Sequence, residues 1–234
     1  MKGILLCIIA SFASLARAAD SWGGSIALTS DYVLRGVSQS DGKAAVQVDL
    51  HYDLPSGLLA GLWASSVKLN SQEPTTAEVD AFLGYRWPVG NDWSTKLTAI
   101  HYAYPWNSPD AHYDYDEIIA GAAYLDRVFV TAAYSPNTSR YSNRGLIRNR
   151  AAFSYDTALQ IPLKQAFSAS AGVGYYDVSR LVGTGYWYWN AGLGYDFRPF
   201  HLDVTYVGTS RSVPALLYND GKLHRWSATL MWRF

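Results

Sequence analysis

Apolar and polar residues alternate along nearly the whole chain from Trp22 onward. In "AVQVDLHYDL" the apolar positions run from Val46 to Leu54 in steps of two, and Asp49 and Asp53 are among the residues between them. A period of two places successive side chains on opposite faces of a β-strand, whereas a helix would require a period near 3.6. The pattern therefore predicts an all-β chain made of two-faced strands.

Twelve segments carry this pattern. The stretch "SIALTSDYVLRG" continues it to residue 36, with Ile26, Leu28, Tyr32 and Leu34 on the apolar face. Most segments have about the 9–11 residues that a tilted strand needs to cross a bilayer. The predicted strands are residues 23–36, 44–54, 57–67, 77–87, 92–104, 115–125, 127–135, 148–160, 165–177, 184–197, 199–209 and 223–234.

The connections between these segments alternate in length. Short turns such as "DLPSG", "WPVGND" and "FRPF" carry Pro, Gly or Asp, as tight turns require. Long connections such as "YPWNSPDAHYDYDE" and "YSPNTSRYSNRGLIRNR" lie between them. Outer-membrane barrels have short periplasmic turns and longer external loops. The predicted fold is an up-and-down antiparallel transmembrane β-barrel of about twelve strands, with both termini periplasmic.

Charge distribution separates a lipid-facing wall from a water-facing one. A Lys or Arg on the lipid face costs about 2–4 kcal/mol at mid-bilayer, and the apolar phase of the predicted strands carries no charged residue. The opposite phase is repeatedly charged and must face a wet interior. The candidate pore-lining residues are Asp31, Arg35, Asp49, Asp53, Glu78, Asp80, Arg86, Lys96, Glu117, Asp203, Arg225 and Arg233.

Composition agrees with this class. The mean hydropathy is −0.06, no apolar run after the N-terminus is long enough for a transmembrane helix, and the chain has 18 Tyr and 9 Trp. Amphipathic rings of this kind concentrate at membrane–water boundaries. Residues 1–18 form a predicted signal peptide with small residues before the cleavage site, which leaves residues 19–234 as the barrel. The mature chain would have no cysteine. It would have 17 basic against 19 acidic residues and no basic patch or charge run, which argues against nucleic acid as a partner.

The C-terminal strand has the apolar phase of a lipid-facing surface. Since no water reaches the hydrocarbon, its backbone must pair with the first strand to close the barrel. A terminal Phe on such a strand resembles the signal that the outer-membrane barrel-assembly machinery reads. The candidate assembly residues are Trp226, Leu230, Trp232 and Phe234.

The segment "SDYVLRGVSQSDGKAAVQ", followed by "GLLAGLWASSV", resembles the TorF family of proteobacterial porins. The shorter stretches "FLGYRW", "HYAYPW", "AYSPN" and "TYVGTS" fit the same family, and the resemblance spans most of the mature chain. The family pattern has a proline where this chain has Ala44. The resemblance implies an outer-membrane barrel and solute passage, and it supplies no catalytic residue.

The predicted function is a narrow outer-membrane channel for passive diffusion of small polar solutes, with membrane lipids as its surroundings. The oligomeric state is left open. One alternative is a non-conducting structural or adhesion barrel, in which the interior charges pair and fill the bore. A barrel-wall hydrolase or acyltransferase is a weaker alternative, because no nucleophile motif such as G-x-S-x-G is present.

No cofactor or metal is predicted. The five histidines lack metal-ligand spacing. The acidic stretch "DAHYDYDE", with Asp110, Asp114, Asp116 and Glu117, lacks the glycine-bearing spacing of a calcium loop and is interpreted as a solvated external loop.

Overall fold

The computed structural model describes residues 21–69, 76–105, 113–142, 145–210 and 222–234. The predicted signal peptide, residues 1–18, lies outside them. No helix in this part of the chain has the length and apolar character needed to cross a membrane.

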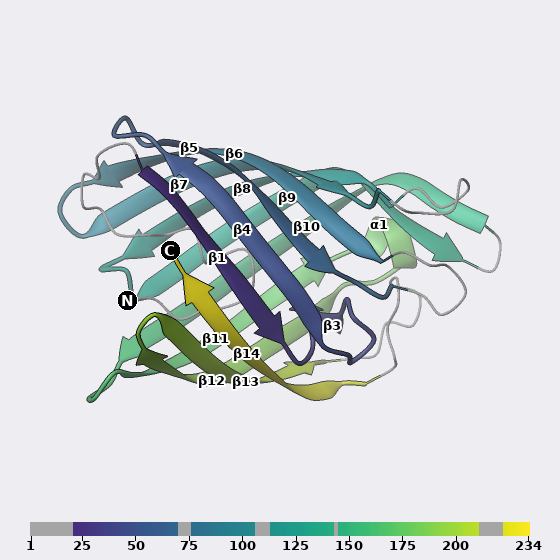
Figure 1. The fold of residues 1–234 in the computed structure, drawn as a ribbon. Helices are drawn as coiled ribbons and strands as arrows, with labels where there is room; N and C mark the ends of the chain where they lie inside the picture. Colours follow the sequence, from purple (N-terminus) through teal and green to yellow (C-terminus); the bar gives the residue numbers. More distant parts are fainter. Residues whose placement is uncertain (1–20, 70–75, 106–112, 143–144, 211–221) are drawn as a thin grey trace.

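Twelve antiparallel strands form one closed barrel, as the alternation predicts (Figure 1). Each strand pairs with its neighbours in the chain, and only the pairing of first with last closes the ring. The wall strands are β1 (Ser21–Thr29), β4 (Ala45–Asp53), β5 (Leu58–Ser66), β6 (Ala77–Val89), β7 (Trp93–Ala103), β8 (Tyr115–Tyr124), β9 (Val128–Ser142), β10 (Gly145–Pro162), β11 (Phe167–Asp177), β12 (Tyr186–Phe197), β13 (Phe200–Thr209) and β14 (His224–Arg233).

Closure involves the last residue of the chain. The backbone N–H of Gly24 donates to the carbonyl of Phe234 at 3.0 Å, and the N–H of Phe234 donates back at 3.1 Å. A Cβ added at Gly24 would lie 2.8 Å from the Phe234 ring, so glycine lets this ring lie against β1. The predicted pairing of the last strand with the first is confirmed.

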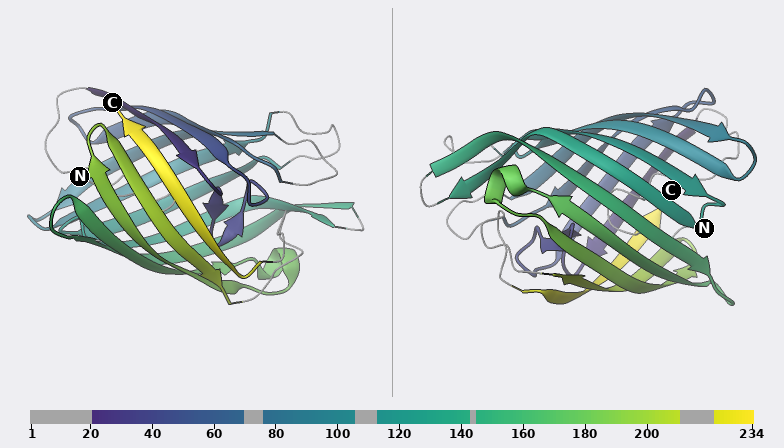
Figure 2. Two further views of the ribbon diagram at one scale, coloured as in Figure 1. Left: turned by 60° about the horizontal axis from the view of Figure 1, so that its bottom comes forward. Right: turned by 180° about the vertical axis from the view of Figure 1, so that it is seen from behind.

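The two ends of the barrel differ, as the connection lengths predict. The start of β1, the end of β14 and the short turns share one end, and the longer connections lie at the other (Figure 2). We call these the short-turn end and the long-loop end.

The outward-facing side chains of the twelve strands form an apolar surface that we call the outer wall. Val46, Val48 and Leu50 on β4 and Leu83 on β6 are exposed, while Glu78 and Asp80 on β6 are buried inside, so the predicted phase is confirmed for both strands. Exposed aromatic side chains surround the short-turn end of the barrel, and a second group of them lies toward the long-loop end. The first group includes Trp22, Trp87, Trp93, Phe167, Tyr195, Phe197, Phe200, Trp232 and Phe234, and the second Tyr134, Trp187 and Trp226.

Some predicted boundaries are wrong. β1 ends at Thr29 rather than at residue 36, because the chain leaves the wall there and forms the two-stranded sheet of β2 (Val33–Leu34) and β3 (Val37–Ser38). Tyr32, predicted to face outward with Ile26 and Leu28, is therefore buried.

Two further differences lie at the long-loop end. The predicted long connection after residue 135 is mostly strand, since β9 extends to Ser142 and β10 begins at Gly145. The connection between β11 and β12 contains a four-residue helix, α1 (Ser179–Val182), which no periodicity predicted.

Candidate functional site

A small hairpin folds inward at the long-loop end of the barrel. Residues 32–39, which we call the inner hairpin, contain β2 and β3 joined by Arg35 and Gly36. Both turn residues have positive φ, at 48° and 80°, which is the geometry of a type I′ turn and favours glycine at the second position. Val33 and Val37 are buried, so the hairpin lies inside the barrel rather than in solvent.

The tip of the inner hairpin reaches far across the bore. A Cβ added at Gly36 would lie 2.3 Å from the Thr209 side chain on β13. The hydroxyl of Tyr186 on β12 donates to the Arg35 carbonyl at 3.0 Å. The Arg35 guanidinium donates to both carboxylate oxygens of Glu117 on β8, at 2.8 and 2.9 Å. These contacts come from strands well separated around the barrel, so the hairpin narrows the bore.

Glu117 and neighbouring tyrosine rings compensate the positive charge of Arg35 inside the barrel. The guanidinium also sits 4.7 Å from the ring centre of Tyr176, a cation–π geometry. Burial alone would lower the pKa of Arg35, but Glu117 and the surrounding tyrosines outweigh it and raise the pKa well above its usual value. Arg35 and Glu117 therefore form a charged, almost fully buried pair.

Asp31 holds the base of the inner hairpin. Its Oδ1 accepts from the hydroxyls of Ser38 at 2.5 Å and Ser40 at 3.0 Å. Its Oδ2 accepts from Arg225 on β14 at 3.0 Å. One carboxylate thus ties both arms of the hairpin to the barrel wall.

Two further candidate residues of β6 lie in the same half of the interior. Glu78 is 0% exposed, and its Oε1 accepts from the Tyr32 hydroxyl at 3.3 Å. Asp80 is also buried, two residues along the same face. The Tyr102 hydroxyl on β7 donates to Glu117 at 3.2 Å, which adds to the polar contacts of this cluster.

The other candidate residues lie nearer the short-turn end. Arg86 donates to Asp53 at 3.4 Å, and Asp49 lies 2.6 Å from His51 Nδ1. Asp49, Asp53 and Arg86 are half-buried, and Lys96 is buried directly opposite Arg86 in the pairing of β6 with β7. The Asp203 carboxylate accepts from Thr205, and Arg233 Nε donates to the sulfur of Met231 at 3.0 Å. The structure thus brings these residues into the barrel interior, with Arg86 and Asp53 as an ion pair. The role of all of them as a pore lining stays a prediction.

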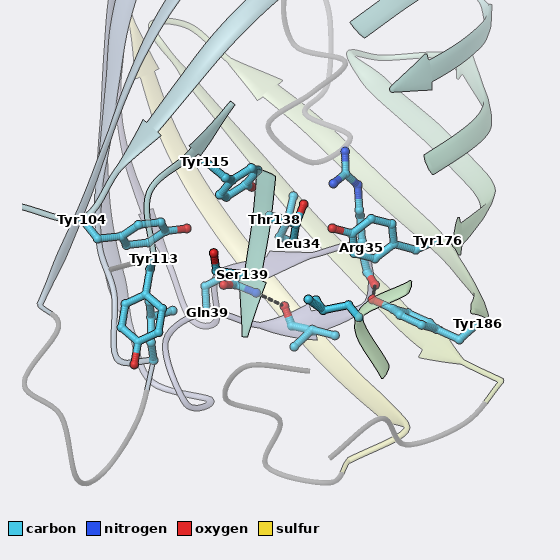
Figure 3. A pocket seen from close by; sticks show the side chains of 13 residues that line it. Leu34, Arg35, Gln39, Tyr104, Tyr113, Tyr115, Thr138, Ser139, Tyr176 and Tyr186 are labelled. Carbon is cyan, nitrogen blue, oxygen red and sulfur yellow. Dashed lines mark hydrogen bonds between the residues drawn. The ribbon is translucent and has the colours of Figure 1, made fainter. Parts of the chain in front are cut away.

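A cavity of about 70 Å³ remains between the inner hairpin and the opposite wall (Figure 3). Arg35, Tyr176 and Tyr186 lie on one side of it, and Gln39, Tyr104 and Tyr113 lie on the other. Tyr115 on β8 and Thr138 and Ser139 on β9 lie between them. Leu34, Val37, Leu69 and Leu181 complete the lining.

Sequence reasoning missed this tyrosine cavity and the serines that hold Asp31. The available signal was the Arg-Gly pair inside "VLRGVS", which is compatible with a tight hairpin turn. It gave no indication that the hairpin would fold inward, because that depends on contacts with β8, β12 and β14.

The acidic stretch considered for calcium does not form one cluster. Glu117 is buried inside, while Asp116 is exposed and contacts His101 at 2.8 Å and Asn137 at 2.8 Å. Asp110 lies outside the described residues. The described residues contain no group of three or more His, Cys, Asp and Glu placed to hold a metal ion.

The fold defines a class of protein, the twelve-stranded closed barrels with an apolar outer wall. Solved structures with this architecture include the NanC porin, with a TM-score of 0.58 and 10% identity over 90% of this chain and 98% of that one. The KdgM porin has a TM-score of 0.56 and 8% identity, over 91% of this chain and 99% of that one. At these identities the likeness shows the fold alone.

Residues 16–232 match the family described as bacterial protein of unknown function (Gcw_chp), and the chain belongs to this family. No curated protein matches the sequence significantly.

Proposed function

We propose that this protein is a narrow outer-membrane channel for passive diffusion of small polar solutes. The observation that carries the proposal is the closed wall itself, which is apolar and exposed outside and charged inside. In water, the exposed Leu, Val, Ile and aromatic side chains of the outer wall would form a patch far larger than soluble monomers carry. In a bilayer, the same side chains meet acyl chains and the aromatic groups meet the two interfaces.

Export and assembly complete the proposal. A signal peptide at residues 1–18 would deliver the chain to the periplasm. Trp226, Leu230, Trp232 and Phe234 all face outward, as the assembly signal in the last strand would require. The TorF resemblance of the segment from Ser30 to Gln47 supports the same kind of protein, and membrane lipids and the assembly machinery are its proposed partners.

Proteins with a similar fold support small polar solutes as the class that passes through the barrel. KdgM and NanC are both named as porins, and one KdgM structure is described as a complex with disordered oligogalacturonate. These names describe the functions of KdgM and NanC. For this chain, the paired interior charges and the inner hairpin favour a narrow path over a wide one.

Planar-bilayer recording of the mature chain tests this function. We expect small, stepwise ionic conductance and slow entry of sugars into liposomes that contain the protein. Folding is checked by the resistance of the barrel to unfolding in SDS without heating. A folded barrel that produces no conductance would contradict the channel, and it would favour the structural barrel, in which the buried ion pairs fill the bore.

A further inference from the structure

We propose that the cavity beside the inner hairpin binds one uncharged ring that has an apolar face and hydroxyl groups at its edge. This inference rests on the proposed channel, because it assigns the class of solute that would pass the constriction. A neutral monosaccharide and a simple phenol share this chemistry, and the experiment below distinguishes them.

Aromatic side chains line the cavity from several sides. Tyr176 and Tyr186 come from β11 and β12, Tyr115 from β8, and Tyr104 and Tyr113 from the connection between β7 and β8 (Figure 3). Neighbouring rings hold these side chains in place, since Tyr104 packs edge-on against Tyr113 at 6.1 Å and Tyr115 stacks on Tyr102 at 4.2 Å. A ring that enters therefore meets preorganised aromatic surfaces.

Polar groups other than the tyrosine hydroxyls lie beside these surfaces. Gln39, Thr138 and Ser139 contribute an amide and two hydroxyls to the lining. The Thr138 hydroxyl donates to Ser135 at 2.7 Å, so its oxygen remains able to accept a hydrogen bond. A binding site lined mainly by apolar and aromatic side chains with a few fixed polar groups suits a small amphipathic ligand.

Charge argues against an anionic ligand. Among the described residues of the lining, Arg35 is the basic one, and both carboxylate oxygens of Glu117 already accept from its guanidinium. An entering carboxylate would have to compete with Glu117 for the guanidinium of Arg35. Because Glu117 already compensates the charge of Arg35, a second carboxylate would be desolvated without a compensating charge, which is costly, so the lining selects against acidic sugars.

The volume of the cavity matches that of a single ring. A cavity needs about 10–15 Å³ to hold one water molecule, so a cavity of about 70 Å³ has room for on the order of five to seven waters. That space accommodates one monosaccharide or one phenol.

Equilibrium binding to the detergent-folded mature protein tests the site without requiring conduction. Isothermal titration with glucose, glucuronate and phenol compares a neutral sugar, its acidic counterpart and a phenolic ring. We expect saturable binding of glucose or phenol, and glucuronate binding at least tenfold more weakly. Whichever of glucose and phenol binds more tightly shows whether the site takes a sugar ring or a phenolic ring.

Three variants in the cavity and one control on the outer wall assign the binding to the cavity. Ser139→Trp fills the cavity, and Tyr115→Ala removes an aromatic face, so each should weaken binding about tenfold. Tyr115→Phe keeps the ring and should bind nearly as wild type. Tyr155→Ala, on the exposed outer wall, is the matched control and should leave binding unchanged.

The outcomes are separable from those of the channel test. Failure of both neutral probes to bind, equal or tighter binding of glucuronate, or full binding by both Ser139→Trp and Tyr115→Ala would overturn the inference. A barrel that binds a neutral ring but stays silent in bilayers would support the site and contradict the channel.

Discussion

At the scale of single residues, Arg35 and Glu117 join the inner hairpin to the far wall. Their side chains are 4% and 2% exposed and lie 2.8 Å apart. Removing one partner of a buried ion pair leaves an uncompensated charge, which costs far more than the pair contributes to stability. The pair therefore ties the position of the hairpin to the stability of the barrel.

Glu117→Gln is expected to lower the free energy of unfolding by about 3–5 kcal/mol, because Arg35 would keep its charge without a carboxylate partner. Urea unfolding of the protein in lipid vesicles measures the change. Asp116→Asn is the matched control at the adjacent position, where the pair with His101 is half exposed and should contribute below about 1 kcal/mol. Equal losses in the two variants would contradict the role given to the buried pair.

At the scale of elements, the inner hairpin differs from the strands around it. Each wall strand takes its place from pairing with two neighbours, whereas β2 and β3 pair only with each other in the described sheets. Side-chain contacts from β8, β12 and β14 hold the hairpin instead. Its removal should therefore change the bore without disturbing the ladder of the barrel.

Deletion of residues 32–39 is expected to raise single-channel conductance severalfold. Residues 30–31 and 40–44 would still join β1 to β4, and this exceeds the about two to five residues that a hairpin loop needs. Planar-bilayer recording measures the conductance, and resistance to SDS without heating shows that the barrel is intact. An intact barrel with wild-type conductance would show that the hairpin does not limit flow.

At the scale of the whole molecule, the outer wall decides which solvent surrounds the protein. Its apolar side chains are exposed along the strands, with aromatic rings gathered toward both ends. A charged side chain in the middle of this wall should be costly in a bilayer, and the cost should fall toward the interfaces.

Leu83→Arg, in the middle of β6, is expected to destabilise the barrel by about 2–4 kcal/mol in lipid vesicles. Val89→Arg, at the short-turn end of the same strand, is the matched control and should cost about 0–1 kcal/mol. Urea titration of both variants gives the two free energies. A mature chain that folds in water without detergent, or equal costs at the two positions, would refute the membrane-facing wall.

Local pattern in the sequence was sufficient for the wall of this protein. Alternation such as that from Val46 to Leu54 is a property of neighbouring residues, so it determined the strand class, the two faces and the twelve wall strands. The same alternation continues through Tyr32 and Leu34, and there it was misleading, because inward and outward positions in a hairpin have the same period.

Only the tertiary structure decided the interior. That Asp31 meets Arg225 and Arg35 meets Glu117 depends on strands brought together by barrel closure, far apart in the chain. Charge alternation predicted which residues would face inward, but it does not determine how far apart residues on opposite strands lie across the bore. The inner hairpin and the tyrosine cavity follow from those distances, and so they appear only once the barrel is closed.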